Sequence, residues 1–535
     1  MSPNPAAPGC IDSIPGQDST RNKTPLNKLA MLTRRHFLLT GGAAFVGAPT
    51  IVRAQAKWRA NPFSLGVASG DPAPDGFVIW TRLAPEPLEA HGGMAIEPVP
   101  AAWEVAVDEN FRTVVARGNA VARPELAHSI HIEVAGLEPD RPYFYRFEAG
   151  GERSPLGRAR TLPLTTSAPL RLRFGVAGCQ DYQAGYYTAY RHLAAEELAF
   201  VFHYGDYIYE YGPDSPAVRK HAGDLLMSLD DYRRRHAQYK SDSDLQAAHA
   251  AHAFFMTFDD HEVRNDWAGD IDDEDKAPPE VFRLHRQSAF QAWYEHMPVR
   301  RQQFPAGSSI QLYRGARFGN LARFDFLDTR QFRTNQPCGD GYRTACADVF
   351  SPRAHMVSAE EEAWLTRNLQ RRDARWNVVA QQVMMMSLDR REQTDAPPGK
   401  LLNLDSWAGY EAQRSRLLAR MRGLDNVVVL TGDEHTNYAG LLHDRDRPVA
   451  VEFVSTSISS DGDGQDIPPF GAAFLANNPQ LKFINNQRGY LACDVTPDEW
   501  HTNFMVVDRV STPGGLISKR AAWAVSRGEP ALHLV

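Results

Sequence analysis

The chain has 535 residues, of which 43% are hydrophobic and 23% charged, a composition typical of a folded globular protein rather than a disordered or fibrous one. Lys and Arg number 58 against 65 Asp and Glu, for a formal net charge of −7, which argues against a nucleic-acid-binding surface. Five cysteines in so long a chain exclude a small disulfide-rich scaffold. The length predicts two or more domains.

The first 56 residues have the pattern of an export signal. Arg34-Arg35 is a twin-arginine pair, a weakly apolar run follows over residues 37–51, and Ala54-Gln55-Ala56 suits a signal peptidase. The run is shorter than the roughly 20 residues that cross a bilayer, so no transmembrane anchor is expected. We predict that residues 1–56 are a signal peptide for the twin-arginine export machinery and that the mature protein is periplasmic or extracellular. Met31 is an alternative start of the chain.

Residues 57–165 have the sequence pattern of a β-sandwich. Short alternating stretches, such as residues 76–81 and 103–107, are separated by turn residues. Tyr143 stands where fibronectin type III domains carry the tyrosine whose hydroxyl ties down the chain upstream of its strand. We predict an immunoglobulin or fibronectin-III-like β-sandwich domain without a catalytic cluster.

Strands and helices alternate after a linker at residues 163–169, which predicts an α/β fold for residues 170–535. Ser358 with Glu361 predicts a helix that begins with a capping box. Other helices are expected over residues 184–198 and 405–423. Strands are expected at residues 171–177, 200–204, 254–258, 376–380 and 426–430.

Four of the predicted strands end in residues that bind metals. In open α/β sheets, functional groups lie at the carboxyl ends of the strands. One Gly-Asp after a strand is a weak signal, but four such ends in chain order predict a metal centre. The residues are Cys179, then Asp206 and Tyr209, then Asp259, Asp260 and His261, and last Asp433 and His435.

The motifs around these residues resemble those of the PhoD-type alkaline phosphatases, a branch of the metallophosphatases related to purple acid phosphatases. The resemblance covers roughly residues 63–507 and implies an αββα four-layer metallophosphatase sandwich preceded by an immunoglobulin-like β-sandwich. Its motifs are FGVAGCQDYQAGYYTAYRHLA, FHYGDYIYEYG, LDDYRRRHAQYK, FDDHEV, FLDTRQFR, NVVAQQV and VVLTGDEH.

The resemblance implies two metal ions that share Asp206 as a bridging ligand. Tyr209 and His435 would bind a ferric ion, as in purple acid phosphatases. Cys179 stands where most relatives have an aspartate, and a thiolate is a plausible iron ligand.

The second metal site departs from the purple acid pattern of one asparagine and two histidines. This chain offers Asp260, Gln382 and Asp433 in those places. Oxygen ligands suit a hard cation, with Ca²⁺ expected first and Mg²⁺ or Mn²⁺ after it. Asp259 is an alternative to Asp260, although alignment on the following His261 favours Asp260.

The expected reaction is hydrolysis of a phosphate ester by a metal-bound hydroxide. His261 is a candidate to protonate the leaving group, and Arg264 is a candidate phosphate clamp. We therefore predict an exported alkaline phosphatase or phosphodiesterase. One alternative is a phospholipase D-like phosphodiesterase on lipid head groups, and another, of a different class, is a cell-surface binding protein that acts through its β domain.

Three other features are expected to be structural. Cys338 and Cys346 are predicted to form a disulfide, and Cys493 to be buried and free. The run Met384-Met385-Met386 is expected in the core. The acidic loops 270–275 and 461–466 are expected to be solvated surface.

Overall fold

The computed structural model describes residues 58–339, 341–392, 399–424 and 426–535. The predicted signal peptide, residues 1–56, lies outside these described residues. Within the part of the chain that the structure describes, no helix has the length and apolar character needed to cross a membrane.

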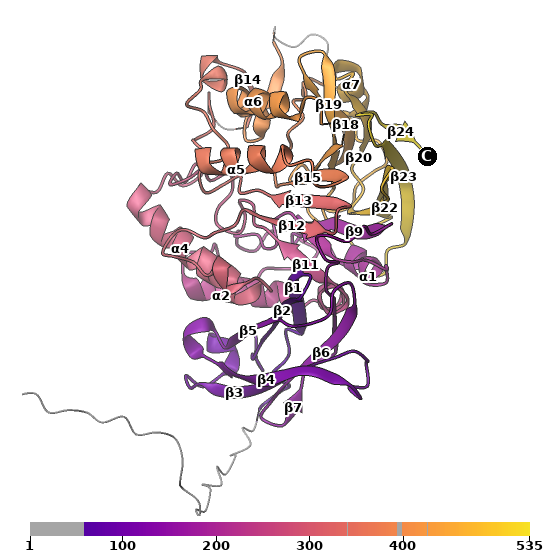
Figure 1. Cartoon of the computed structure of the whole chain (residues 1–535). Coiled ribbons are helices and arrows are strands. Elements are labelled where there is room, and N and C mark those ends of the chain that lie inside the picture. The colour runs from indigo at the N-terminus through magenta and orange to yellow at the C-terminus, as the bar shows by residue number, and fades with distance from the viewer. Residues whose placement is uncertain (1–57, 340, 393–398, 425) are drawn as a thin grey trace, which may run out of the picture. The chain divides into compact units, whose positions relative to one another are not determined.

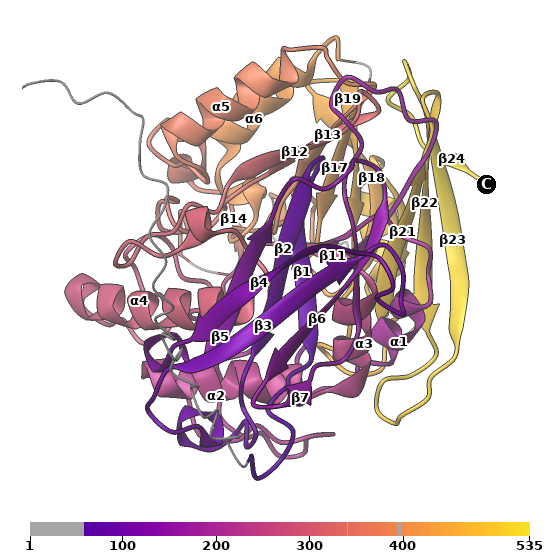
Figure 2. The ribbon, with the colours of Figure 1, turned by 60° about the horizontal axis from the view of Figure 1, so that its bottom comes forward.

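Two antiparallel layers pack face to face in the N-terminal region, and Figure 2 shows them one in front of the other. In strand β6, Tyr143, Tyr145 and Phe147 point into the shared core while the residues between them are less buried, as a period of two requires. One layer contains β1 (Val67–Ala73), β2 (Gly76–Arg82) and β5 (Ser129–Val134). The other contains β3 (Val99–Ala106), β4 (Val114–Ala122), β6 (Pro142–Ala149), β7 (Glu152–Arg153) and β8 (Gly157–Arg160).

Tyr143 makes the contact that its position in the sequence predicts. Its hydroxyl accepts a hydrogen bond from the backbone N–H of Glu138 at 2.9 Å and donates to the carbonyl of Glu138 at 3.3 Å. The side chain therefore fastens the turn before β6 to the strand itself, as in a tyrosine corner.

The N-terminal sandwich is continuous with the rest of the molecule. Strand β1 pairs in parallel with β11 (Ala253–Met256), with Ser69 opposite Ala253. As a result β1, β2 and β5 form one end of a ten-stranded sheet with the order β24-β23-β22-β21-β9-β10-β11-β1-β2-β5. The division into domains 57–165 and 170–535 stays a prediction, but hydrogen bonding between strands does not stop at that boundary.

A seven-stranded sheet with the order β12-β13-β15-β17-β19-β18-β20 packs on the ten-stranded one (Figure 1). Phe174, Phe324 and Phe453 belong to the core between the two sheets. The other strands of the larger sheet are β9 (Leu172–Ala177), β10 (Val201–His203), β21 (Gly489–Val495), β22 (Glu499–Val507), β23 (Ile517–Ser526) and β24 (His533–Leu534). The smaller sheet contains β12 (Arg314–Phe318), β13 (Ala322–Phe326), β15 (Trp376–Ala380), β17 (Val427–Thr431), β18 (Asn437–Asp444), β19 (Arg447–Val454) and β20 (Leu481–Asn485), and β14 (Tyr342–Thr344) pairs with β16 (Leu401–Asn403) outside it.

Helices cover the outer face of each large sheet, which confirms the predicted αββα four-layer fold. The larger sheet carries α1 (Thr188–Ala194), α2 (Leu229–Lys240), α3 (Ser243–Ala251) and α4 (Pro279–His296). The smaller carries α5 (Ala359–Leu369), α6 (Glu411–Met421) and α7 (Gly471–Asn477). Short 3-10 helices are η1 (Ala90–Gly93), η2 (Pro124–Leu126), η3 (Arg301–Gln303), η4 (Ala347–Phe350) and η5 (Trp407–Gly409).

Two predicted helices are shorter in the structure. The one expected over residues 184–198 is reduced to α1, because the chain before it forms a loop in which Tyr186 N–H donates to the carbonyl of Val510. The one expected over residues 405–423 is divided between η5 and α6.

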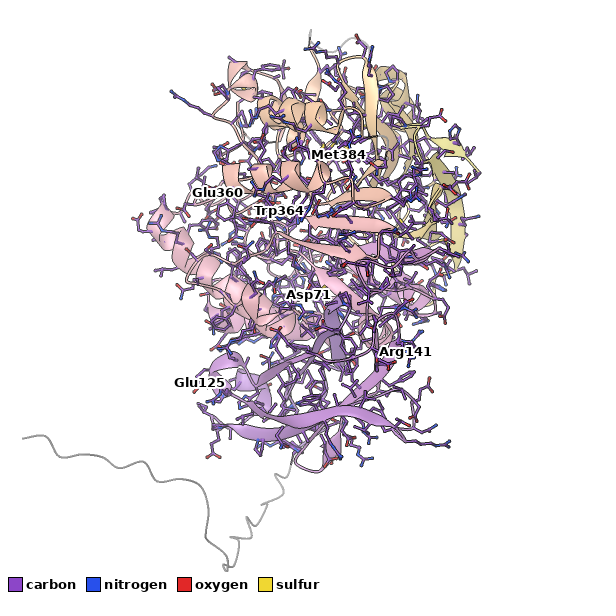
Figure 3. The ribbon with its side chains drawn as sticks, viewed as in Figure 1. Asp71, Glu125, Arg141, Glu360, Trp364 and Met384 are labelled. Carbon is purple, nitrogen blue, oxygen red and sulfur yellow. A yellow bond between two sulfur atoms is a disulfide. The ribbon has the colours of Figure 1, made fainter. Side chains whose placement is uncertain are left out.

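Of the two hydrogen bonds in the capping box predicted at Ser358, only one forms. Ser358 Oγ accepts from the backbone N–H of Glu361, but the Glu361 carboxylate accepts from the backbone N–H of Asp328 instead of returning to Ser358. The loop after β13 has therefore taken the second bond of the capping box. The three methionines 384–386 are buried in the core beside α5 and α6 as predicted, and Figure 3 labels Met384 among the strands.

Candidate metal centre

The predicted metal-binding residues follow the carboxyl ends of parallel strands. β9, β10 and β11 are parallel neighbours in the larger sheet, and β17 lies in the smaller sheet packed against it. Their ends bring together three groups of residues whose potential ligand atoms lie within 4.8 Å of one another. These groups are Cys179 with Asp206 and His435, Asp206 with Asp260 and His261, and Asp259 with Asp260 and Asp433.

Four of these residues have left-handed backbone conformations. The φ angles are 51° at Cys179, 54° at Asp206, 70° at Asp433 and 49° at His435. This region is sterically unfavourable for residues with a Cβ, and such strain gathers at functional sites. The sharp turn that follows each strand thus aims the ligand side chain at one common point.

The first group surrounds one oxygen of Asp206. Cys179 Sγ lies 3.2 Å from Asp206 Oδ2, and the Tyr209 hydroxyl lies 3.0 Å from the same oxygen. His435 Nε2 is 3.1 Å from the Tyr209 hydroxyl. The structure therefore brings together all four residues that the sequence assigns to the ferric site.

The second and third groups contain buried carboxylates with open oxygen atoms. Among the described residues, no hydrogen-bond donor reaches Asp206 Oδ1, Asp259 Oδ2 or Asp260 Oδ1. Buried oxygens without a partner are costly in a folded protein unless a cation binds them. The geometry therefore fits a pair of metal ions that share Asp206.

Electrostatics point in the same direction. Burial, with the carboxylates of Asp259 and Asp260, raises the pKa of Asp433 well above its ordinary value, although Arg330 opposes this. Burial likewise raises the pKa of Asp206. A cation would stabilise the ionised carboxylates that these surroundings disfavour.

Gln382, a predicted ligand of the second site, has its amide engaged elsewhere. Its Oε1 accepts from the Thr329 hydroxyl at 2.6 Å, and its Nε2 donates to the carbonyl of Leu327 at 2.9 Å. Its side chain is fully buried and holds the loop after β13 in place. These bonds account for its burial without a metal.

Arg330 is a central residue that sequence reasoning missed. Its fully buried guanidinium donates to Asp259 Oδ1 at 2.5 Å and lies 3.6 Å from Asp260 Oδ1. On its other side it pairs with Asp405 at 2.9 Å. Arg330 occupies one oxygen of Asp259, and the backbone N–H of Asp266 occupies one oxygen of Asp260 at 2.8 Å, so each carboxylate keeps one open oxygen and the choice of Asp260 over Asp259 stays a prediction. Only its place in the motif FLDTRQFR pointed to it.

His261 is held rigidly at the edge of the centre. Its Nδ1 lies 2.8 Å from Glu210 Oε2, and its ring stacks on Tyr209 with 4.1 Å between centroids. Burial lowers the pKa of His261, but the carboxylates of Glu210 and Asp260 outweigh burial and raise it well above its ordinary value. Glu210, which sequence reasoning did not single out, therefore favours the protonated imidazole.

Asp461 is exposed, as expected for the acidic loop 461–466, but it also contacts the metal centre. Its Oδ2 lies 2.9 Å from His435 Nδ1. A carboxylate on the second nitrogen of a metal-binding histidine fixes the ring orientation. The local sequence is acidic and polar, and only the folding of this loop over His435 reveals the contact.

Arg264 lies outside the three groups. It is almost fully buried, and its Nη2 lies 3.2 Å from Asp275 Oδ2 in the other acidic loop. Its predicted contact with phosphate stays a prediction.

Comparisons with known proteins agree with this geometry. The PhoD-like phosphatase family matches residues 174–504, and its N-terminal domain family matches residues 48–163. Alkaline phosphatase D of Bacillus subtilis (strain 168) is 45% identical over 496 residues, which cover 90% of this chain and 84% of that protein.

Solved structures give the same result. The structure of PhoD superposes with a TM-score of 0.86 at 44% identity and covers 89% of this chain and 92% of that one. The purple acid phosphatase PPD1 of yellow lupin (Lupinus luteus) has a TM-score of 0.52 at 12% identity, covering 86% of this chain and 74% of its own, and shares the fold alone.

Proposed function

The chain belongs to the PhoD-like phosphatase family and is a phosphatase, a hydrolase of phosphate esters, and from this premise we propose that its reaction takes place at a ferric iron–calcium pair. The observation that supports a shared pair is the carboxylate of Asp206. Cys179 and Tyr209 approach one of its oxygens, the other has no hydrogen-bond partner among the described residues, and Asp206 belongs to two of the candidate ligand groups. The family membership favours this function over the phospholipase D-like and binding-protein alternatives.

Cys179, Asp206, Tyr209 and His435 would hold the iron. Phenolate and thiolate ligands suit a ferric ion. Burial raises the pKa of Cys179 and of Tyr209, so a bound cation would be needed to stabilise the thiolate and the phenolate. Asp260 and Asp433, with Asp206 between the sites, would hold the calcium, and Mg²⁺ or Mn²⁺ could take its place.

When bound, such a pair lowers the pKa of water toward neutrality and neutralises charge on the phosphoryl oxygens. The chain's own residues supply the rest. His261 would donate a proton to the leaving alkoxide, and its contact with Glu210 favours the protonated imidazole that this role needs. Arg264 remains our candidate for a phosphate clamp, and a phosphate would have to displace Asp275 from it.

Twin-arginine export belongs to the same proposal. Arg34-Arg35 and the small residues at 54–56 support it. Fusing residues 1–56 to a reporter tests the route: the reporter should leave the cytoplasm, and a double Arg34→Lys, Arg35→Lys change should retain it inside.

Metal analysis with visible absorption tests the centre most directly. We expect iron and calcium in the purified protein and a phenolate-to-iron absorption band that Tyr209→Phe removes. Tyr211→Phe is the matched control, because the Tyr211 ring contacts His261 edge-on, whereas the hydroxyl beside Asp206 and His435 belongs to Tyr209. Zinc without iron, or a band that survives Tyr209→Phe, would contradict the assignment.

A further inference from the structure

A cavity of about 420 Å³ lies beside the metal centre. Glu434 forms part of its wall and stands between Asp433 and His435, one from each proposed metal site. None of the proposed ligands or acid–base groups requires this space. Its position next to the metals suits the part of a substrate that is bonded to the phosphate.

Aromatic rings around one guanidinium form the walls of the cavity. Phe470 and Phe474 contact each other with 4.7 Å between ring centroids. The Cζ atom of Arg390 lies 5.7 Å from the ring centroid of Tyr342 and 5.5 Å from that of Phe474. The ring centroid of Tyr438 lies 5.9 Å from the same Cζ atom. Flat aromatic groups stack on both kinds of surface.

Arg390 does not offer a spare positive charge. Its Nη2 pairs with Glu434 Oε1 at 2.6 Å, and both side chains are 4% exposed. Because the pair is neutral, an anionic group has little reason to enter the cavity. Arg390, Phe474 and Tyr438 are almost fully buried, whereas Tyr342 at the rim is exposed, so the Tyr342 ring offers the main face on which an occupant can stack.

Tyr342 is exposed and yet held in place. It is 59% exposed at the rim of the cavity. Strand β14, which carries it, pairs with β16, where Tyr342 lies opposite Asn403, and the disulfide between Cys338 and Cys346 closes the loop on both sides. Because the backbone that carries the ring is held before binding, less conformational entropy is lost when a ligand stacks on it.

We propose that this cavity binds the ring-bearing alcohol part of the phosphate ester while its phosphoryl group lies at the metals. This inference rests on the proposed phosphatase function and names its substrate class: esters of a planar aromatic ring, either an aryl group or a nucleoside base. Tyr342 and Phe474 are the specificity-determining residues, and Arg390 supports them.

Steady-state kinetics of the metal-loaded enzyme test the proposal. The probes are phenyl phosphate, adenosine 5′-monophosphate, n-hexyl phosphate and glycerol 2-phosphate, with wild type, Tyr342→Ala and Phe474→Ala. Phe350→Ala is the control, because Phe350 is 61% exposed in neighbouring η4 but does not line this cavity. Phe474 is part of the core, whereas Tyr342 is exposed, so Tyr342→Ala tests the cavity without disturbing the core.

We expect wild type to prefer at least one ring-bearing ester, and both cavity variants to lower kcat/KM for that ester roughly tenfold while changing glycerol 2-phosphate less than twofold. A loss confined to adenosine monophosphate identifies a nucleoside site, and a loss confined to phenyl phosphate an aryl site. Equal losses for hexyl phosphate, or for all four esters, overturn the ring assignment while phosphatase activity itself persists. If the holoenzyme hydrolyses none of them, the proposed function fails and this inference with it.

Discussion

The N-terminal sandwich and the metal centre are joined through one ten-stranded sheet but follow opposite rules. In the sandwich, side chains alternate between core and surface, and Tyr143 satisfies both backbone groups of Glu138. At the metal centre, Asp206 is buried with a left-handed backbone and an oxygen that no described donor reaches. The first region is arranged for stability, whereas the second holds buried charge that a bound cation would offset.

The largest expected effect comes from Asp206→Asn. Losing the charge shared by both ligand groups should lower kcat for phosphate ester hydrolysis by at least about 10³-fold. The same change should leave the metal-free protein as stable or more stable, because it removes a buried charge. Activity, metal content and melting temperature of the metal-free protein check this.

Asp498→Asn is the control for that substitution, since the Asp498 side chain is 83% exposed. If Asp206→Asn keeps its metals and its activity, Asp206 is not the shared ligand.

Arg330→Met should destabilise the protein strongly, with or without metals. It leaves Asp259 and Asp405 buried without their common partner, and breaking a buried ion pair costs about 3–5 kcal/mol. Denaturant unfolding measures the loss. Arg416→Met, which breaks the exposed pair with Glu362, should cost less than about 1 kcal/mol. Similar losses in the two variants would contradict a central role for Arg330.

Lys240 connects the two regions and should give a pH-dependent stability. Its Nζ lies 4.3 Å from the ring centroid of Trp80 in β2 and 5.2 Å from that of Tyr207 beside the metal centre. Burial lowers the pKa of Lys240 to about 7, from 10.5 in the unfolded chain. Between these values the unfolded state binds more protons, so stability rises as pH increases from about 7 to 10.5.

The measurement is the free energy of unfolding of wild type minus that of Lys240→Met across this range. We expect the difference to change by at most about 1.4 kcal/mol per pH unit, in favour of wild type as pH rises. A difference that stays constant with pH would show that the lysine is not forced to lose its proton on folding.

The smallest expected effect comes from Tyr143→Phe. Removing the hydroxyl bound to the Glu138 backbone should lower the free energy of unfolding by about 1 kcal/mol and leave kcat unchanged. Tyr209→Phe should do the reverse and reduce activity with little loss of stability. If both tyrosine variants behaved alike, the contrast between the two regions would be wrong.

Much of the site could be predicted because its ligands follow strand ends in fixed motifs. Cys179, Asp206, Tyr209 and His435 come together as the motifs indicate, and the disulfide between Cys338 and Cys346 forms as expected. Glu210 and Asp461 were not predicted as partners of the two histidines, because an acidic residue in a polar stretch carries no local sign of what it will contact.

The sequence by itself determined the alternating strands and helices of an α/β fold, the candidate metal-binding residues at the strand ends and the tyrosine corner, because hydrophobic periodicity and short motifs are local properties of the chain. Only the tertiary structure decided that β1 joins the sandwich to the catalytic sheet, that Arg330 holds Asp259, and that Tyr342 and Phe474 meet around Arg390. These contacts join residues far apart in the sequence. Their energies come from burial and charge pairing, which exist only once the strands have brought the side chains together.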